Sequence, residues 1–323
     1  MMKSQFFLII LLSPGVIAEM IAQETDYGPG YQTIMVTNPS FTGSEGDGIL
    51  RLSYFNFYPG MNYNLHSFFV SYDSYFPVLH GGAGFYVSND YTGGIINDLR
   101  GGFTYSYHLQ AGENVYINAG LGASFFYRGF NMSGIILPDQ IDPLRGAVLP
   151  SAETPDVKGH AAFDVGAGLL LIAGRYTAGL SVGHLTEPDL SGYGSSVEKM
   201  KRKVTVHLEA TFFDKGRMKI ALRPMVYSMI QGSDFQLGTG AGFEIAILSV
   251  SSMLLINKAK DLDLQTGISF NKGPFFAFYK YSFNLVSGNS LLPASLFQHA
   301  GIGISLNYVD KRKTIKTINL PKL

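Results

Sequence analysis

Seven side chains that could act as acids or bases fall on the polar-facing positions of alternating segments of the chain. Carboxylates and imidazoles that converge in a membrane protein could perform general acid–base chemistry, so an outer-membrane hydrolase is one function to consider. In such a hydrolase the catalytic side chains would come from separate segments of the chain. Their spacing in the sequence therefore neither supports nor excludes this function. We favour a hydrogen-bonded polar network, because buried polar groups are normally paired. The seven are Asp164, Glu209, His207, Glu244, Asp263, Lys280 and His299.

Metal, thiol and cofactor chemistry have weaker signals. None of the 7 His residues forms a zinc-binding pair at helical spacing, and the absence of Cys removes thiolate nucleophiles, disulfides and Cys-ligated metals. The glycine clusters "HGGAGFY", "GLGAS", "GTGAGFE" and "GIGIS" lie where strand alternation continues, whereas a dinucleotide site needs glycines that open a helix. We therefore expect no catalytic residues, no metal and no cofactor. The glycines are interpreted as positions for bends and for close packing beneath aromatic rings.

The elements that carry these side chains have the periodicity of strands. In residues 115–128 the odd positions are mostly apolar, whereas the even positions include Asn, Gly, Ser and Arg. Only 15% of the residues are charged, there are 24 Phe and 19 Tyr, and no run after the N-terminus is long and apolar enough for a membrane helix. A period of two with one apolar and one polar face predicts a sheet that meets lipid on one side.

About fourteen such segments can be counted, and the links between them are asymmetric. Links after even-numbered segments are tight, whereas several after odd-numbered segments are long, as in outer-membrane barrels with short periplasmic turns and long external loops. A soluble β-sandwich is the competing fold, but its strands are usually shorter than these. The segments run near 48–57, 64–76, 80–90, 98–110, 113–128, 159–172, 174–185, 200–213, 216–230, 233–246, 248–257, 259–271, 274–286 and 297–309.

The sequence therefore predicts an all-β protein, a transmembrane antiparallel up-and-down β-barrel of about 14 strands. Residues 1–22 read as a secretory signal, with a short apolar core after Lys3 and cleavage after Ala22 or Ala18. Residues 23–47 are interpreted as a periplasmic lead-in, 48–309 as the barrel and 310–323 as a periplasmic tail. The longest external loop is expected at 129–158, folded over or into the barrel mouth because it contains several apolar residues.

Two basic clusters remain outside the strand pattern. The first, "EKMKRK", either contacts anionic lipid headgroups at the outer rim or is a solvated strand entry. The second is the tail "DKRKTIKTINLPKL", which follows the last strand and is either disordered or a docking peptide. Its cations would suit an acidic partner surface.

The order of several motifs resembles the PorP/SprF family, outer-membrane components of the type IX secretion and gliding machinery of Bacteroidetes. The resemblance covers nearly the whole mature chain. It rests on "TNPSFTG", "FNFYPG", "SYDSYFPVLHGGAGFYVSNDYTGG", "FDVGAGLLL", "RYTAGLSVGHLTEP", "FAFYKYSFN" and "HAGIGISLNY".

The resemblance implies a protein that is not an enzyme, sits in the outer membrane and acts as an adaptor or anchor; the even number of strands places both termini in the periplasm. Its implied partners are outer-membrane lipid, periplasmic secretion-ring or peptidoglycan-associated lipoproteins, and a secreted adhesin or cargo protein, but no nucleic acid. The alternative is a transport channel for hydrophobic or small solutes, which would need an open or gated lumen. Candidate partner-binding residues lie in the lead-in and the tail: Asn38, Pro39, Phe41, Gly43, Lys311, Arg312 and Lys313.

Overall fold

The computed structural model describes residues 33–60, 65–131, 136, 138–142, 144–147, 159–190, 199–213, 220–286 and 295–306. Among these residues, no helix is long and apolar enough to cross a membrane. The predicted signal at 1–22 and the predicted tail at 310–323 lie outside the described residues.

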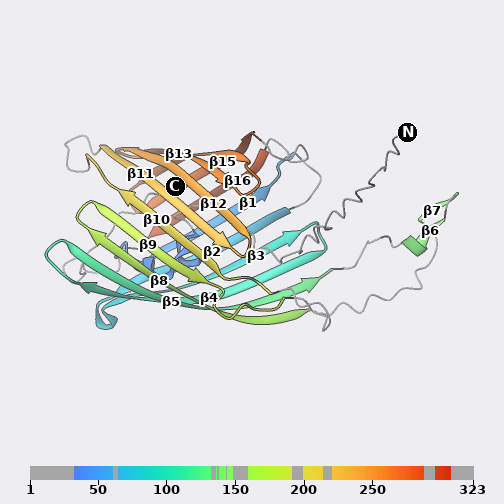
Figure 1. Ribbon diagram of the computed structural model, residues 1–323, viewed down its shortest axis with the longest axis horizontal. Coiled ribbons are helices and arrows are strands. Elements are labelled where there is room, and N and C mark those ends of the chain that lie inside the picture. Colours follow the sequence, from blue (N-terminus) through green and yellow to red (C-terminus); the bar gives the residue numbers. More distant parts are fainter. Residues whose placement is uncertain are drawn as a thin grey trace, which may run out of the picture.

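Fourteen antiparallel strands form a closed barrel in which each strand pairs with its neighbours along the chain (Figure 1). The first and last strands close it, from Ile49 opposite Ser305 to Phe57 opposite Phe297. The predicted fold class is therefore confirmed. The strands are β1 Ile49–Phe57, β2 Leu65–Phe76, β3 Gly81–Thr92, β4 Ile96–Gln110, β5 Val115–Phe130, β8 His160–Ala173, β9 Tyr176–Gly183, β10 Lys203–Ala210, β11 Ile220–Gln231, β12 Asp234–Ile245, β13 Leu248–Asn257, β14 Leu262–Lys272, β15 Phe275–Val286 and β16 Ser295–Ser305.

The strand ends lie close to the predicted ones, and β10 shows one of the larger differences. The sequence pattern extends from 200 to 213, whereas β10 is shorter and ends at Ala210. Phe213 has a φ of 64°, a left-handed conformation that a strand does not accommodate. Beyond Ala210, Phe212 still pairs with Leu222 in an isolated bridge, so the apolar alternation continues past the regular strand and ends where Phe213 turns away.

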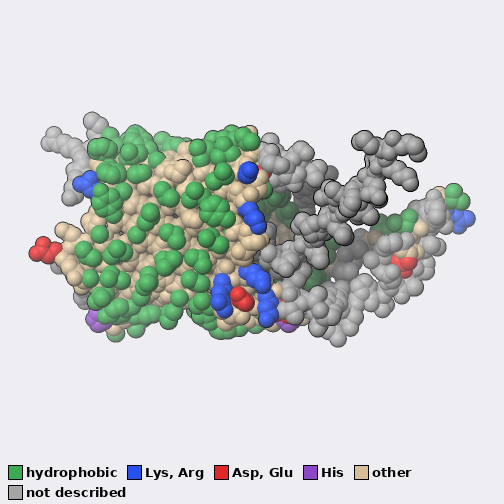
Figure 2. All heavy atoms as spheres, in the orientation of Figure 1, with side chains coloured by type: hydrophobic (Ala, Val, Ile, Leu, Met, Phe, Trp, Pro, Cys, Tyr) green, Lys and Arg blue, Asp and Glu red, His purple; other side chains and the backbone are tan. Residues whose placement is uncertain are grey.

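The two faces of the wall differ in the way that the alternation predicts. In β4, Leu99, Phe103 and Leu109 are exposed on the outside, whereas Thr104 and His108 are buried on the inside. Figure 2 shows apolar side chains spread over the visible outer face of the barrel. An apolar band of this kind faces lipid in outer-membrane barrels, with the polar side chains in the lumen.

The two ends of the barrel are named here by their connections. At the turn end, short links join β2 to β3, β8 to β9, β12 to β13 and β14 to β15. At the loop end lie the longest connections, between β5 and β8 and between β9 and β10. Figure 2 shows Lys and Arg side chains gathered at the loop end, on the right of the barrel.

The long β5–β8 connection contains η4 Pro138–Gln140 and a small hairpin of β6 Ile141–Asp142 and β7 Gly146–Ala147. The hairpin lies away from the barrel wall, beyond the loop end (Figure 1), and the side chains of Ile136, Ile141 and Leu144 are exposed. The described part of this connection therefore does not fold over the barrel mouth, contrary to expectation. The described ends of the β9–β10 connection pack at that end instead, where Leu190 and Met200 are buried against Phe126.

Residues 33–47, which we name the plug, lie inside the barrel and contain α1 Ile34–Thr37 and η2 Pro39–Phe41. The sequence pattern places this part of the lead-in on the periplasmic side, with Phe41 either packed under the barrel floor or offered to a partner, whereas the structure places it within the lumen. The physical reason is that its side chains and backbone meet matching polar and apolar groups on the lumen wall.

Candidate functional site

The plug is shaped by residues that form tight turns. Asn38 precedes η2, and its Oδ1 accepts hydrogen bonds from the Ser40 backbone N at 3.0 Å and the Ser40 hydroxyl at 2.5 Å. Pro39 occupies the first position of the helix, where a missing N–H costs nothing. Gly43 and Gly46 then adopt φ values of 70° and 83°, which glycine reaches without strain. "TNPSFTG" is therefore a compact double turn.

Lumen side chains satisfy the backbone carbonyls of the plug. Ser181 of β9 donates its hydroxyl to the Thr37 carbonyl at 2.6 Å. The Ser40 carbonyl accepts from Ser106 Oγ at 2.9 Å and from Asn118 Nδ2 at 3.4 Å. Because buried carbonyls without partners are costly, these contacts hold an irregular segment inside the barrel.

Two further contacts extend this network around the wall. The Thr42 carbonyl accepts from His108 Nε2 at 3.2 Å, and the Thr42 hydroxyl donates to Thr104 Oγ1 at 2.8 Å. On the β8 and β9 side of the wall, Asn38 Nδ2 donates to the Leu169 carbonyl at 3.4 Å and to the Leu180 carbonyl at 3.5 Å. The plug thus bonds to β4, β5, β8 and β9.

A buried ionic cluster fixes the end of the plug to the first two strands. Asp73 of β2 accepts from the Gly43 backbone N at 2.7 Å and from Arg51 Nη1 at 2.5 Å. The other nitrogen of the Arg51 fork, Nη2, lies 3.2 Å from Glu45 Oε1 in the plug. The Arg51 and Asp73 side chains are 3% and 4% exposed, so removing either charge would leave the other buried without its main partner.

Glycines on the lumen wall make room for the plug. A Cβ on Gly120 would lie 2.3 Å from the Ser40 backbone N, and one on Gly168 would lie 2.0 Å from Asn38 Oδ1. A Cβ on Gly82 would lie 2.1 Å from the Thr42 carbonyl oxygen. The predicted packing beneath aromatic rings occurs at Gly301 and Gly303, which lie under Phe278 and Phe276. At the other three glycines the neighbour is the plug.

Apolar contacts complete the seat of the plug. Ile34, Met35 and Phe41 form one buried cluster with residues of β1, β2, β3 and β8, namely Phe55, Phe69, Tyr86, Leu170 and Ile172. The Phe41 ring also lies 4.9 Å from the His207 ring of β10, between centroids. Burying a side chain of this size contributes about 1.5–3 kcal/mol. The plug therefore contacts the wall from β10 round to β1.

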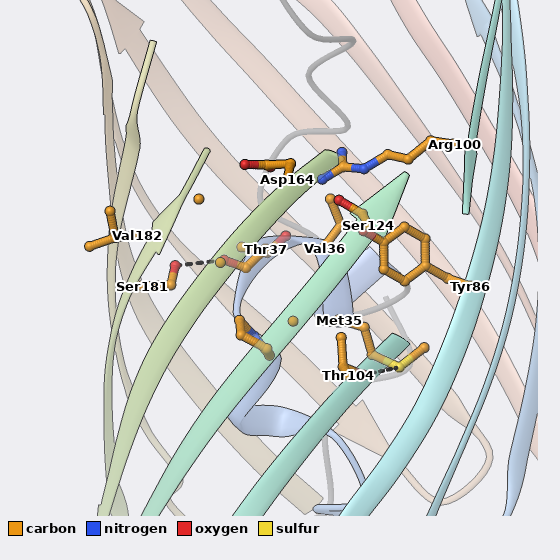
Figure 3. Close-up of a pocket in the computed structure, with 14 residues that line it drawn as sticks. Met35, Val36, Thr37, Tyr86, Arg100, Thr104, Ser124, Asp164, Ser181 and Val182 are labelled. Atoms are coloured by element: carbon orange, nitrogen blue, oxygen red, sulfur yellow. Dashed lines mark hydrogen bonds between the residues drawn. The ribbon is translucent and has the colours of Figure 1, made fainter. Parts of the chain in front are cut away.

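A small cavity remains beside the plug, between Met35, Val36 and Thr37 and the wall residues Tyr86 and Ser124 (Figure 3). Figure 3 shows the Arg100 side chain extending toward Asp164 across one side of this cavity. Its volume is about 30 Å³, enough for one or two waters. A cavity of this size does not hold an organic substrate.

The predicted acids and bases are distributed among separate clusters. Asp164 accepts from the Thr186 hydroxyl at 2.9 Å and lies 2.8 Å from His184 Nδ1. Burial lowers the pKa of His184, which lies just beyond the end of β9. The Arg100 guanidinium lies 4.5 Å from the centre of the Phe126 ring. This cluster ties the start of the β9–β10 connection to the wall.

The other predicted acids and bases lie on different strands. Glu209 and Glu244 pair with Arg223 at 3.3 and 3.0 Å, and Asp263 accepts from Asn284 at 2.7 Å. Lys280 and His299 face each other in the β15–β16 register. Among the described residues, no group of three or more His, Cys, Asp or Glu side chains is arranged to hold a metal ion. The absence of catalysis stays a prediction.

The candidate partner-binding residues fall into two groups. Asn38, Pro39, Phe41 and Gly43 come together in the plug, where Asn38 is 0% exposed and Phe41 is 2% exposed. Partner binding through them stays a prediction and would require the plug to leave the lumen. Lys311, Arg312 and Lys313 lie outside the described residues.

Sequence reasoning missed the wall residues that hold the plug. The sequence pattern did not single out Arg51, Asp73, Ser106 or Ser181, and it marked Asn118 only as a polar position of an alternating strand. Their one available signal is that charged and amide side chains recur on the lumen face of neighbouring strands. That pattern shows a polar lumen, but it does not show which segment fills it.

A closed antiparallel barrel with an apolar outer face and a polar, plug-containing lumen is an outer-membrane β-barrel protein. Residues 19–297 match the family described as type IX secretion system membrane protein PorP/SprF. The chain belongs to this family, as the resemblance in the sequence indicated.

Solved structures of outer-membrane barrels share the fold at low sequence identity. The toluene transporter TodX of P. putida is 13% identical, with a TM-score of 0.50 over 85% of this chain and 94% of that chain. A TodX deltaS2S3 mutant, described as a monoaromatic hydrocarbon channel, is 13% identical with a TM-score of 0.53 over the same shares. These likenesses concern the fold alone. No curated protein sequence matches the chain.

Proposed function

We propose that this protein is a non-enzymatic adaptor or anchor of the type IX secretion machinery, and that its barrel works with the lumen closed. Membership of the secretion family supports a role in this machinery. The observation that carries the finer proposal is the plug, which contacts the wall from β10 round to β1. A solute channel would have to break these contacts, whereas a docking platform needs only a fixed barrel.

The proposed topology has the turn end and both termini in the periplasm and the long connections outside the cell, as in other outer-membrane barrels. In this orientation the basic tail from Lys311 onward meets periplasmic partners. We propose that a secretion-ring or peptidoglycan-associated lipoprotein binds there through an acidic surface. Several charges together attract such a surface more strongly than one exposed pair. The barrel would then hold a secreted adhesin or cargo protein near the machinery.

The proposal is tested by deleting residues 310–323 in cells. We expect co-purification of periplasmic machinery and surface display of the dependent cargo to fall, while the barrel still assembles and shifts on gels after boiling. A second variant replaces residues 310–323 with an uncharged tail of equal length, which separates the effect of the charges from the effect of tail length. If deletion of the whole gene leaves secretion intact but blocks uptake of a solute, the adaptor proposal is wrong.

A further inference from the structure

The outer face of the barrel carries an apolar groove of about 290 Å³ near the turn end. It lies across β14, β15, β16 and β1 and is formed by Phe270, Phe275, Ala277, Ile302 and Leu52. Among these, Phe270, Phe275 and Ile302 are 46%, 61% and 58% exposed, so the groove opens on the side that faces lipid. It is separate from the plug and from its contacts.

The strand register explains why the surface is hollowed here. Phe270 lies opposite Ala277, Ala277 lies opposite Ile302, and Ile302 lies opposite Leu52. These four positions make one row across the outside of the sheet, in which Ala277 is the only small side chain. The methyl group of Ala277 lies between two large side chains. The channel above it is about as deep as the large side chains are longer than the methyl group.

A cation stands at the end of this groove. Lys272 is the last residue of β14, it is exposed, and it lines the groove at the turn to β15. No carboxylate in the described part of the chain pairs with it. An apolar channel that ends at an unpaired ammonium is complementary to a molecule with a hydrocarbon chain and an anionic head.

We propose that this groove binds one glycerophospholipid, with an acyl chain along Ala277 and the phosphate at Lys272. The position supports this choice of ligand, because the groove lies within the apolar band that faces the bilayer. The occupant must therefore be dissolved in the membrane. The lipid is a bound component of the barrel wall, distinct from the bulk lipid around it.

The test measures lipid retention by the full-length protein. The protein is purified in a mild detergent, stripped of lipid and titrated with palmitoyl-oleoyl-phosphatidylglycerol, and bound lipid is counted by native mass spectrometry. The wild type should retain one lipid. Ala277→Phe fills the groove and should abolish this binding, whereas the matched outward change Ala123→Phe on β5 should not.

The headgroup contact is tested separately. Lys272→Gln should weaken binding about tenfold, as expected for the loss of one charge-assisted hydrogen bond. Lys258→Gln, an exposed cation at the loop end, should have no effect. Folding of each variant is verified by the gel shift after boiling, and Ala277→Leu replaces Ala277→Phe if the latter does not fold.

Three results would overturn the proposal. One is equal lipid retention by Ala277→Phe and Ala123→Phe, which would show an adventitious lipid only. Another is unchanged lipid affinity in Lys272→Gln, which would show that Lys272 does not bind the lipid phosphate. The third is retention of lipid A but not of phosphatidylglycerol under the same conditions.

Discussion

At the scale of single residues, Asp73 is the main junction between plug and barrel. It accepts from both the Gly43 backbone and the Arg51 guanidinium, in a buried position. Asp73→Ala would leave Arg51 with Glu45 as its remaining partner and leave the Gly43 N–H without its acceptor. The expected loss is about 3–5 kcal/mol, the cost of breaking a buried ion pair. Urea unfolding in detergent measures it.

The control for Asp73 is Asp98→Ala, which breaks the partly exposed pair with Arg128. Exposed pairs contribute only about 0–1 kcal/mol, so this variant should stay close to the wild type. Equal destabilisation by the two changes would show that the Asp73 cluster does not hold the plug.

Gly120 and Gly122 provide a second comparison within one strand. A Cβ on Gly120 would collide with the Ser40 backbone at 2.3 Å, whereas one on Gly122 would have its nearest neighbour, Thr104 Cγ2, at 3.4 Å. We expect Gly120→Ala to displace the plug and Gly122→Ala to leave it seated. Backbone atoms at such a short distance cannot give way without a shift of the whole turn.

Cysteine labelling measures this displacement, because the chain has no Cys of its own. A reporter at Ser44, which is buried in the plug, should react slowly in the wild type and in Gly122→Ala, and much faster in Gly120→Ala. Equal labelling rates in Gly120→Ala and the wild type would contradict the claim that the plug packs against Gly120.

At the scale of elements, the strands could be predicted from sequence and the plug could not. Each strand meets lipid on one side and the lumen on the other, so its pattern is local, as in β4 and β5. The plug is specified by partners that are distant in the sequence: Asn38 bonds to carbonyls 131 and 142 residues away. Its own sequence shows only turns, and those turns fit a lead-in outside the barrel equally well.

The hydroxyl and amide side chains that bond the plug carbonyls can be removed together. The combination Ser106→Ala, Asn118→Ala and Ser181→Ala takes away the donors to Ser40 and Thr37. Each buried carbonyl left without a partner costs about 1–3 kcal/mol, so the plug should loosen while the strand ladder holds. Conductance in planar bilayers should rise above that of the wild type.

The matched control is the combination Ser53→Ala, Ser71→Ala and Ser282→Ala. These hydroxyls are buried on the wall, and the structure gives them no hydrogen-bond partner. Conductance should then stay at the wild-type level. A rise of the same size in both combinations would mean that loss of wall hydroxyls, and not release of the plug, changes conductance.

At the scale of the whole molecule, the closed barrel and the plug form one unit. The β1–β16 pairing closes the wall, and Ser305 of β16 donates to Asp47 at the end of the plug at 3.2 Å. The chain therefore joins its plug to both its first and its last strand. A unit held in this way suits an adaptor whose partners bind at its ends.

We propose that the protein works in secretion with its plug in place. The Thr42 and Thr104 hydroxyls are 2.8 Å apart, so Thr42→Cys with Thr104→Cys should form a disulfide that locks the plug to β4. The measurement is surface display of the cargo that depends on this gene, in cells carrying the oxidised pair, with Thr42→Cys alone as control. We expect display to be unchanged. Loss of display in the locked protein, with recovery on reduction, would contradict it.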